Sequence, residues 1–283
     1  MAYWEWGDAE NPQVVVCVHG LSRQGRDFDR LAQALCGRFR VVCPDVAGRG
    51  RSQWLAAEHY RVEQYVADMV TLLARLRAER LGWVGTSMGG LIGLGLAGLG
   101  DSPLQALVLN DIGPAIAEDG LRRLASNLGQ RMEFPDLEQA ADYLWSVSSS
   151  FGPHSREEWL ALCRPMLVEQ DGGGLRLHYD PAIMRSFAQL ADPAAASALA
   201  AAEQAVWALY DAVRAPTLLL RGAQSDILDE ATAQAMRVRG PRARLLQWDA
   251  VGHAPTLVSR QQIEPVVEFL LGHLGAAQAP PAP

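Results

Sequence analysis

Short apolar runs alternate with segments of helical periodicity along the first part of the chain. Residues 13–18 are almost continuously apolar, as in a strand buried on both faces. Runs of this kind predict strands at residues 3–6, 13–18, 39–43, 81–84 and 106–109. Apolar positions at helical spacing predict helices at residues 28–35, 62–80 and 91–99. This alternation is typical of a mostly parallel α/β sheet with helices on both faces.

The alternation stops after Pro114 and resumes near residue 206. The segment between contains no convincing apolar strand run, and its alanine-rich stretch at residues 194–202 predicts a helix. Beyond it we expect strands at 217–220 and 243–248, and helices at 230–238 and 263–271. The sequence thus predicts an α/β core at residues 1–113 and 206–275, a helical lid at 114–205, and a disordered tail at 276–283.

The predicted lid follows the strand after the helix at residues 91–99, on the carboxyl side of the sheet. Ligands of open α/β sheets bind at that edge, so an insertion there would cover the binding site. An independent interaction domain is the alternative. A lid is favoured because the chain returns to the same sheet.

Composition and charge exclude several classes of protein. A net charge of −7 over 283 residues argues against a nucleic-acid-binding surface. The most apolar stretch, residues 89–100, is too short and too glycine-rich to span a membrane, and the first residues do not resemble a signal peptide. The four cysteines lack metal-binding spacing, so we interpret them as reduced structural thiols. We therefore expect a cytoplasmic protein with no nucleic-acid or membrane partner; its oligomeric state is not indicated.

The strongest chemical motif is the pentapeptide Gly85-Thr86-Ser87-Met88-Gly89, which lies between a predicted strand and a predicted helix. A serine at such a sharp turn takes a strained backbone conformation that holds its hydroxyl clear of the sheet edge. The flanking positions must be glycine because side chains there would collide with the neighbouring strand and helix. Ser87 is the predicted nucleophile; an ordinary glycine-serine loop is the alternative.

A serine nucleophile needs a base, and the base needs an acid to orient it. Among six histidines, His253 lies in the loop after the last predicted strand and can reach a serine on the same sheet edge. Two aspartates compete for the orienting role. Asp226 follows the penultimate strand, and the order serine, aspartate, histidine along the chain favours it. Asp111, at the end of strand 106–109, is the possible alternative acid.

The oxyanion of an acyl-transfer intermediate needs backbone N–H donors. We expect one from Met88, directly after the nucleophile, and one from Leu21 in the loop after strand 13–18. His19, in the same loop, is expected to hold the loop by hydrogen bonding. No metal is predicted.

The elbow at residues 85–89, the His19-Gly20 loop, the turn at residues 45–52, Asp226 and His253 together resemble the α/β-hydrolase superfamily. The resemblance implies an eight-stranded, mostly parallel sheet, a lid between the sixth and seventh strands, and no cofactor. It implies that residues 45–52 form a structural turn near the site. Leu21 follows Gly20 where some lipases carry a His-Gly-Gly-Gly loop, which argues against large triglyceride substrates.

A serine nucleophile argues against dehalogenases and epoxide hydrolases of this superfamily, which need a carboxylate at that position. The leading prediction is a serine hydrolase of small or medium carboxylic esters or lactones, acting through an acyl-enzyme. A carbon–carbon hydrolase of a diketone ring-fission product and a ligand-binding module with residual hydrolysis are the alternatives. Arg23, one of four arginines near the site with Arg26, Arg49 and Arg51, and the tryptophans Trp145 and Trp159 are possible substrate-binding residues.

Overall fold

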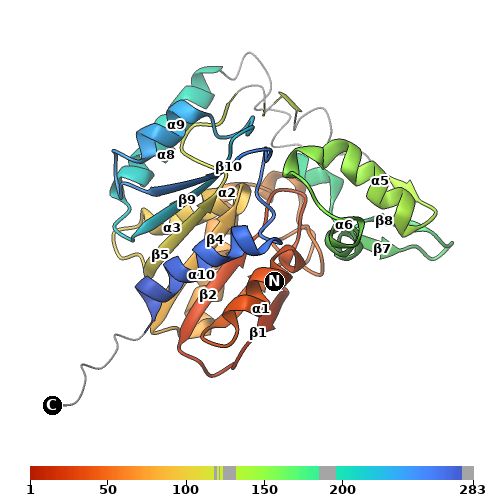
Figure 1. Cartoon of the computed structure of the whole chain (residues 1–283), viewed down its shortest axis with the longest axis horizontal. Helices are drawn as coiled ribbons and strands as arrows, with labels where there is room; N and C mark the ends of the chain where they lie inside the picture. Colours follow the sequence, from red (N-terminus) through yellow and green to blue (C-terminus); the bar gives the residue numbers. More distant parts are fainter. Residues whose placement is uncertain (118–119, 121, 124–131, 185–195, 276–283) are drawn as a thin grey trace.

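The computed structural model describes residues 1–117, 120, 122–123, 132–184 and 196–275. Its main sheet has seven strands in the order β1-β3-β2-β4-β5-β9-β10, and only β1 runs antiparallel to its neighbour (Figure 1). The strands are β1 (Tyr3–Trp6), β2 (Gln13–Val18), β3 (Arg40–Pro44), β4 (Arg80–Thr86), β5 (Leu104–Asn110), β9 (Thr217–Gly222) and β10 (Arg244–Trp248).

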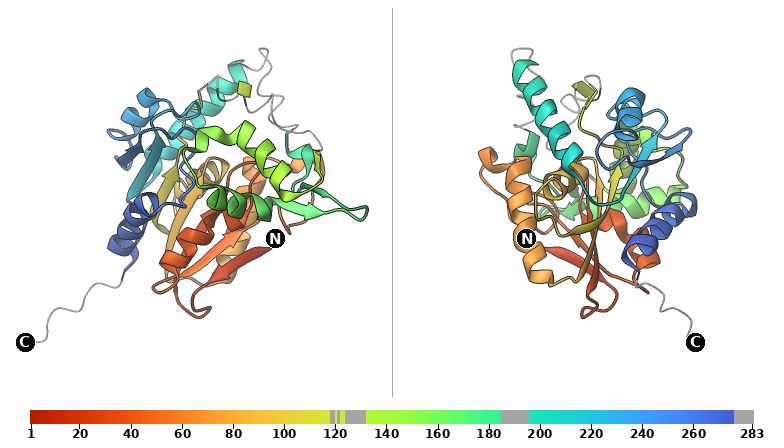
Figure 2. Two further views of the ribbon diagram at one scale, coloured as in Figure 1. Left: turned by 45° about the vertical axis from the view of Figure 1, so that its right-hand side comes forward. Right: turned by 90° about the vertical axis from the view of Figure 1, so that its left-hand side faces the viewer.

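Helices cover both faces of this sheet, which Figure 2 shows in its right-hand view. One face carries α1 (Asp29–Leu35) and α10 (Arg260–Leu274), and the other carries α2 (Val62–Leu76), α3 (Met88–Ala97), α8 (Ala196–Ala212) and α9 (Glu230–Met236). Strand β2 is apolar from Val14 onwards because both faces of the sheet are covered. Val14 and Val16 enter one core, and Val15 and Cys17 enter the other. The predicted α/β class is confirmed.

Helix α2 is shorter than predicted. It ends at Leu76 because Arg77 takes the left-handed conformation, with φ of 52°. Its buried residues include Tyr65 and Met69, whereas Val70 is exposed.

The inserted segment, residues 114–205, is not purely helical. It contains α5 (Leu137–Ser148), α6 (Arg156–Cys163) and the short turns η3 (Ser149–Phe151), η4 (Arg164–Met166) and η5 (Pro181–Met184). It also holds a three-stranded antiparallel sheet of β6 (Glu133–Phe134), β8 (Leu175–Leu177) and β7 (Leu167–Glu169). Strands of two or three residues leave no recognisable apolar run, which is why the sequence did not predict them. Two further short turns, η1 (Gly25–Phe28) and η2 (Ala57–His59), belong to the core.

The structure bears on the predicted end of the lid but not on the predicted tail. The predicted junction between residues 205 and 206 falls inside α8, a single helix that packs against α3 of the core. The predicted tail at 276–283 and the first part of the alanine-rich stretch lie outside the described residues.

The strand count of eight, which the resemblance implied, is wrong for the described residues. The apolar runs themselves predict the seven strands that are found. The insertion accordingly follows β5, the fifth strand of the main sheet in chain order, and precedes β9, the sixth. None of the described helices is long and apolar enough to cross a membrane.

Candidate active site

Ser87 occupies the sharp turn between β4 and α3. Its φ of 52° and ψ of −117° confirm the strained backbone expected at this position. A Cβ on Gly89 would lie 2.0 Å from the carbonyl oxygen of Val18, and one on Gly85 would lie 2.3 Å from the carbonyl oxygen of Gly89. Only glycine fits at either position, because both backbones are closely packed.

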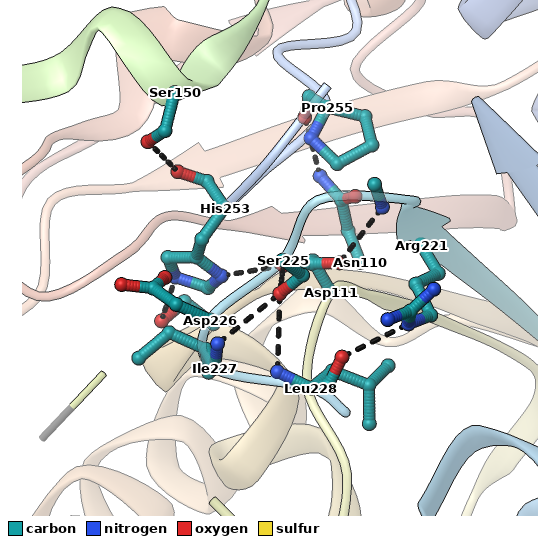
Figure 3. Close-up of polar contacts among 12 residues, drawn as sticks. Asn110, Asp111, Ser150, Arg221, Ser225, Asp226, Ile227, Leu228, His253 and Pro255 are labelled. Atoms are coloured by element: carbon teal, nitrogen blue, oxygen red, sulfur yellow. Dashed lines mark hydrogen bonds and ion pairs between the residues drawn. The ribbon is translucent and has the colours of Figure 1, made fainter. Parts of the chain in front are cut away.

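His253 lies in the loop after β10, and its side chain reaches Ser87. The imidazole Nε2 is 3.0 Å from Ser87 Oγ, and the histidine itself is 7% exposed. The hydroxyl of Ser150, from η3 of the insertion, donates to the carbonyl oxygen of His253 (Figure 3). The predicted approach of His253 to Ser87 is therefore present, and the insertion contacts the loop that carries it.

The carboxylate hydrogen-bonded to His253 is that of Asp111, the alternative candidate, and not that of Asp226, the preferred one. Asp111 Oδ2 lies 2.7 Å from His253 Nδ1. The same carboxylate accepts hydrogen bonds from the Gly222 amide at 2.9 Å and from the Ser225 hydroxyl at 2.5 Å. Because β5 lies directly beside β4, the residue after β5 ends up next to the serine turn.

Asp226 pairs instead with Arg123 of the inserted segment. The guanidinium binds both carboxylate oxygens, with Arg123 Nη2 2.9 Å from Asp226 Oδ1, and the carboxylate side chain is 32% exposed. Burial acts to raise the pKa of Asp226, but the hydrogen bonds and charge of Arg123 outweigh it and hold the pKa below its usual value. Its neighbour Ser225 makes the contact to Asp111, as Figure 3 shows.

Asn110 joins the serine turn to the histidine loop, a role that no sequence pattern indicated. Its side-chain amide donates to Thr86 Oγ1 at 3.0 Å and to the carbonyl oxygen of Pro255 at 2.8 Å. The backbone carbonyl of Asn110 accepts a hydrogen bond from the backbone N–H of Ser87 at 3.0 Å. One buried residue thus fixes the segments on both sides of the serine–histidine contact.

The amides of Leu21 and Met88 are the two predicted oxyanion donors. Neither amide donates a hydrogen bond within the part of the chain that the structure describes. Gly20, next to Leu21, lies close to the nucleophile, since a Cβ there would be 3.7 Å from Ser87 Cβ. Both donors thus belong to segments that adjoin Ser87.

His19 holds the Leu21 loop, as predicted. Its Nε2 accepts from the Val46 amide at 3.0 Å, which assigns the proton to Nδ1, and Nδ1 donates to the Gly20 carbonyl at 2.7 Å. Complete burial lowers the pKa of His19 to about 3, so the ring stays neutral.

Arg49 braces the same loop from the turn at residues 45–52. Its Nε donates to the Leu21 carbonyl at 2.7 Å, and its Nη1 donates to Ala47 and to the Tyr65 hydroxyl. Asp45 closes the turn by accepting from the amides of Gly25 and Arg51. The turn has the structural role that the resemblance implied.

A cavity of about 130 Å³ opens beside Ser87 and His253. Its wall combines the Leu21 loop with residues of the insertion, among them Tyr143, Leu144, Val147, Phe151 and Met166. The insertion supplies most of the apolar lining. Tyr143, Leu144 and Val147 come from α5, and Phe151 and Met166 come from the short turns η3 and η4.

Of the proposed substrate-binding residues, only Arg23 lines this cavity. Trp159 is buried and donates to the Ala141 carbonyl, and Trp145 packs edge-on against it with ring centroids 5.1 Å apart. Both indoles belong to the packing of the insertion. Arg26 pairs with Asp29, and Arg51 lies over the Trp4 ring.

Among the described residues, no cluster of three or more His, Cys, Asp or Glu side chains could hold a metal ion.

Comparison with known proteins places this fold and site in a family. The model of the alpha/beta hydrolase fold family matches residues 13–258. The chain belongs to the α/β-hydrolase family. This hydrolase is 50% identical over 276 residues to the 3-hydroxybutyrate-oligomer hydrolase of Cupriavidus necator, a match that covers 96% of this chain and 93% of that protein.

Two further similarities fit the assignment. An alpha/beta hydrolase of Novosphingobium aromaticivorans has a crystal structure with a TM-score of 0.83 and 34% identity, covering 95% of this chain and 92% of that one. Lipase LipV of Mycobacterium tuberculosis is 35% identical over 111 residues, which are 39% of this chain and 41% of that protein.

Proposed function

We propose that this α/β-hydrolase cleaves short carboxylic esters of hydroxy acids, with 3-hydroxybutyrate oligomers as the leading substrate class. The observation that carries the proposal is the hydrogen-bonded series Ser87, His253 and Asp111 at the wall of a cavity. The 50% identity to a 3-hydroxybutyrate-oligomer hydrolase supports the substrate class.

In the proposed reaction His253 Nε2 removes the proton from Ser87 Oγ as the oxygen attacks the ester carbonyl. Asp111 holds the Nδ1–H of the ring and stabilises the imidazolium that forms. The ester carbonyl oxygen becomes an oxyanion, which accepts hydrogen bonds from the amides of Leu21 and Met88. His253 then protonates the departing alkoxide, leaving an acyl group on Ser87.

Water completes the proposed cycle. His253 accepts a proton from the water as it attacks the acyl carbonyl. The second tetrahedral intermediate then releases the acid while His253 returns the proton to Ser87 Oγ, which restores the neutral imidazole and the serine hydroxyl. Because the leaving group of a hydroxy-acid oligomer is itself a hydroxy acid or a shorter oligomer, one triad can shorten the chain repeatedly.

The size and lining of the cavity favour short acyl groups. At about 130 Å³ it is smaller than typical pockets for drug-sized ligands, which are roughly 300–1,000 Å³, and its lining is largely apolar. We assign the inserted segment the role of a lid over this cavity, since Tyr143, Phe151 and Met166 form part of its wall.

The test is the release of monomeric 3-hydroxybutyrate from the dimer and trimer by wild type and by Ser87→Ala. We expect turnover by the wild type and a loss of at least about 1,000-fold in the variant. Ser146→Ala is the matched control, because Ser146 is exposed on α5 and lies outside the cavity wall.

A parallel series of p-nitrophenyl esters from acetate to palmitate measures the acyl-length preference. The small cavity predicts an optimum at about four to six carbons. Undiminished turnover by Ser87→Ala, or an optimum at palmitate, would contradict the proposal.

A further inference from the structure

Arg23 is a buried cation in the wall of the cavity that contains Ser87. Gly20 lies between the two residues. A Cβ added to Gly20 would be 3.8 Å from Arg23 Cγ and 3.7 Å from Ser87 Cβ. The Arg23 side chain is 10% exposed, and it lines the same cavity as Ser87 and His253. Burying a guanidinium beside a largely apolar cavity is costly unless the charge is paired and its N–H groups are used.

Asp27 supplies the pairing. Arg23 Nε donates to Asp27 Oδ2 at 2.6 Å, and Arg23 Nη2 donates to Asp27 Oδ1 at 2.7 Å. This two-point contact fixes both groups in one plane. Asp27 is also part of the cavity wall, and its side chain is 18% exposed. The wall therefore contains a rigid pair with little net charge.

The pair keeps hydrogen-bonding capacity on both members. Arg23 Nη1 faces the sulfur of Met166, a weak acceptor, and the further contact of Nη2 to the Leu162 carbonyl is long at 3.5 Å. The guanidinium carbon lies 5.7 Å from the centroid of the Phe151 ring. The Asp27 carboxylate, with about four acceptor sites, uses two on Arg23.

The other arginine buried near the site shows what a purely structural arrangement looks like here. Arg49 is completely buried and donates to two backbone carbonyls and the Tyr65 hydroxyl at 2.6–2.8 Å. Each arginine directs one nitrogen at a methionine sulfur, Arg49 Nη2 at Met88 and Arg23 Nη1 at Met166. The difference is position, because Arg49 is absent from the cavity wall and Arg23 lines it.

We propose that the Arg23–Asp27 pair binds the hydroxyl of a 3-hydroxyacyl substrate and selects such substrates over unsubstituted acyl esters. This inference rests on the proposed function. A hydroxyl is both donor and acceptor, so it can donate to a free lone pair of Asp27 or, at the other edge of the guanidinium, accept from Arg23 Nη1. Because Asp27 already balances the charge of Arg23, the pair suits a neutral hydroxyl better than a second carboxylate.

The experiment compares p-nitrophenyl 3-hydroxybutyrate with p-nitrophenyl butyrate, which differ only in the hydroxyl. We expect the wild type to prefer the hydroxylated ester by about 10- to 100-fold in kcat/KM, since a lost partner leaves polar groups unpaired. The double variant Arg23→Met/Asp27→Leu should lose this preference while it still hydrolyses the butyrate. Replacing both members of a buried pair by apolar residues is the change a fold tolerates best.

Asp27→Asn, nearly identical in shape, is the second variant and should reduce the preference about 10-fold. Arg26→Met is the matched control in the same loop, because Arg26 pairs with Asp29 outside the cavity wall. Equal kcat/KM for the two esters in the wild type would overturn the proposal. So would an unchanged preference in Asp27→Asn or in a folded double variant.

A second pair of substrates separates the hydroxyl from the carboxylate end of an oligomer. If the double variant loses activity on the free acid of the 3-hydroxybutyrate dimer but not on its methyl ester, the pair binds a carboxylate and the proposal is wrong. Loss of all turnover in Ser87→Ala is independent of these ratios, so the proposed function and this inference are tested separately.

Discussion

Asp111 Oδ2 lies 2.7 Å from His253 Nδ1, and the carboxylate is completely shielded from solvent. The contact joins the residue after β5 to the loop after β10, with the loop after β9 between them. Ser225 from that middle loop donates to the same carboxylate oxygen. The loop in which the acid was predicted therefore supplies, through the neighbour of Asp226, a hydrogen bond to Asp111.

The first prediction separates the two aspartates. Asp111→Asn should lower kcat by about 1,000- to 10,000-fold, because the amide cannot stabilise the imidazolium and favours the wrong tautomer. Asp226→Asn should lower kcat by less than about 10-fold, since Arg123 occupies its carboxylate. Steady-state kinetics on one ester measures both, and a larger loss for Asp226→Asn would contradict the assignment.

A second prediction concerns the neutral state of His19. The pKa of His19 is about 3 in the folded protein, against its ordinary value of 6.5 in the unfolded chain. At a pH between these two values, unfolding makes the ring take up a proton. Stability contributed by His19 is therefore complete above about pH 6.5 and is lost as the pH falls below it, by about 1.4 kcal/mol per unit. Urea unfolding at pH 5.0, 6.0 and 7.5 measures the slope.

His19→Asn is the control for that slope, since it removes the titrating ring and keeps a donor for the Gly20 carbonyl. The difference in unfolding free energy between wild type and variant should shrink as the pH falls from 7.5 to 5.0. A difference that stays constant across this range would show that His19 takes up no proton on unfolding.

A third prediction tests the close packing at the serine turn. Gly89→Ala would force a Cβ to within 2.0 Å of the Val18 carbonyl oxygen, so the strand and helix must separate. We expect a loss of about 3 kcal/mol or more in unfolding free energy, with loss of activity. Gly100→Ala, where no atom lies within 4 Å of the added Cβ, should change stability by less than about 1 kcal/mol.

A fourth prediction concerns the hydrogen bond between Tyr65 and Arg49. Tyr65→Phe removes one of the two acceptors of Arg49 Nη1, the hydroxyl 2.8 Å away, and leaves one N–H of the buried guanidinium unsatisfied. The expected cost is about 1–3 kcal/mol in unfolding free energy. Tyr3→Phe, at an exposed tyrosine, is the control and should have almost no effect. Equal denaturation midpoints for the two variants would count against the bracing role of Arg49.

The fold class and the contact between Ser87 and His253 could be predicted because local pattern determines them. A continuous apolar run such as residues 13–18 reports burial on both faces, and the glycines around Ser87 report a turn with no room for side chains. Both signals lie within a few residues, so tertiary structure does not need to be known.

The acid could not be predicted, because its identity depends on which loop lies next to the histidine. Asp111 and Asp226 both follow predicted strands and both lie between Ser87 and His253 in the chain, so chain order does not distinguish them. The sheet order and the ion pair of Asp226 with Arg123 decide between them. The roles of Trp145 and Trp159 also depend on packing within the insertion, whose short strands carry no periodic signal.

Active-site labelling with a fluorophosphonate, followed by peptide mass spectrometry, tests directly whether Ser87 is the nucleophile. We expect one label per chain, on the peptide that contains Ser87, and a loss of ester hydrolysis in proportion to labelling. The variant His253→Ala should not be labelled. A label on a different residue, or full activity in fully labelled protein, would contradict the assignment of Ser87 as the nucleophile.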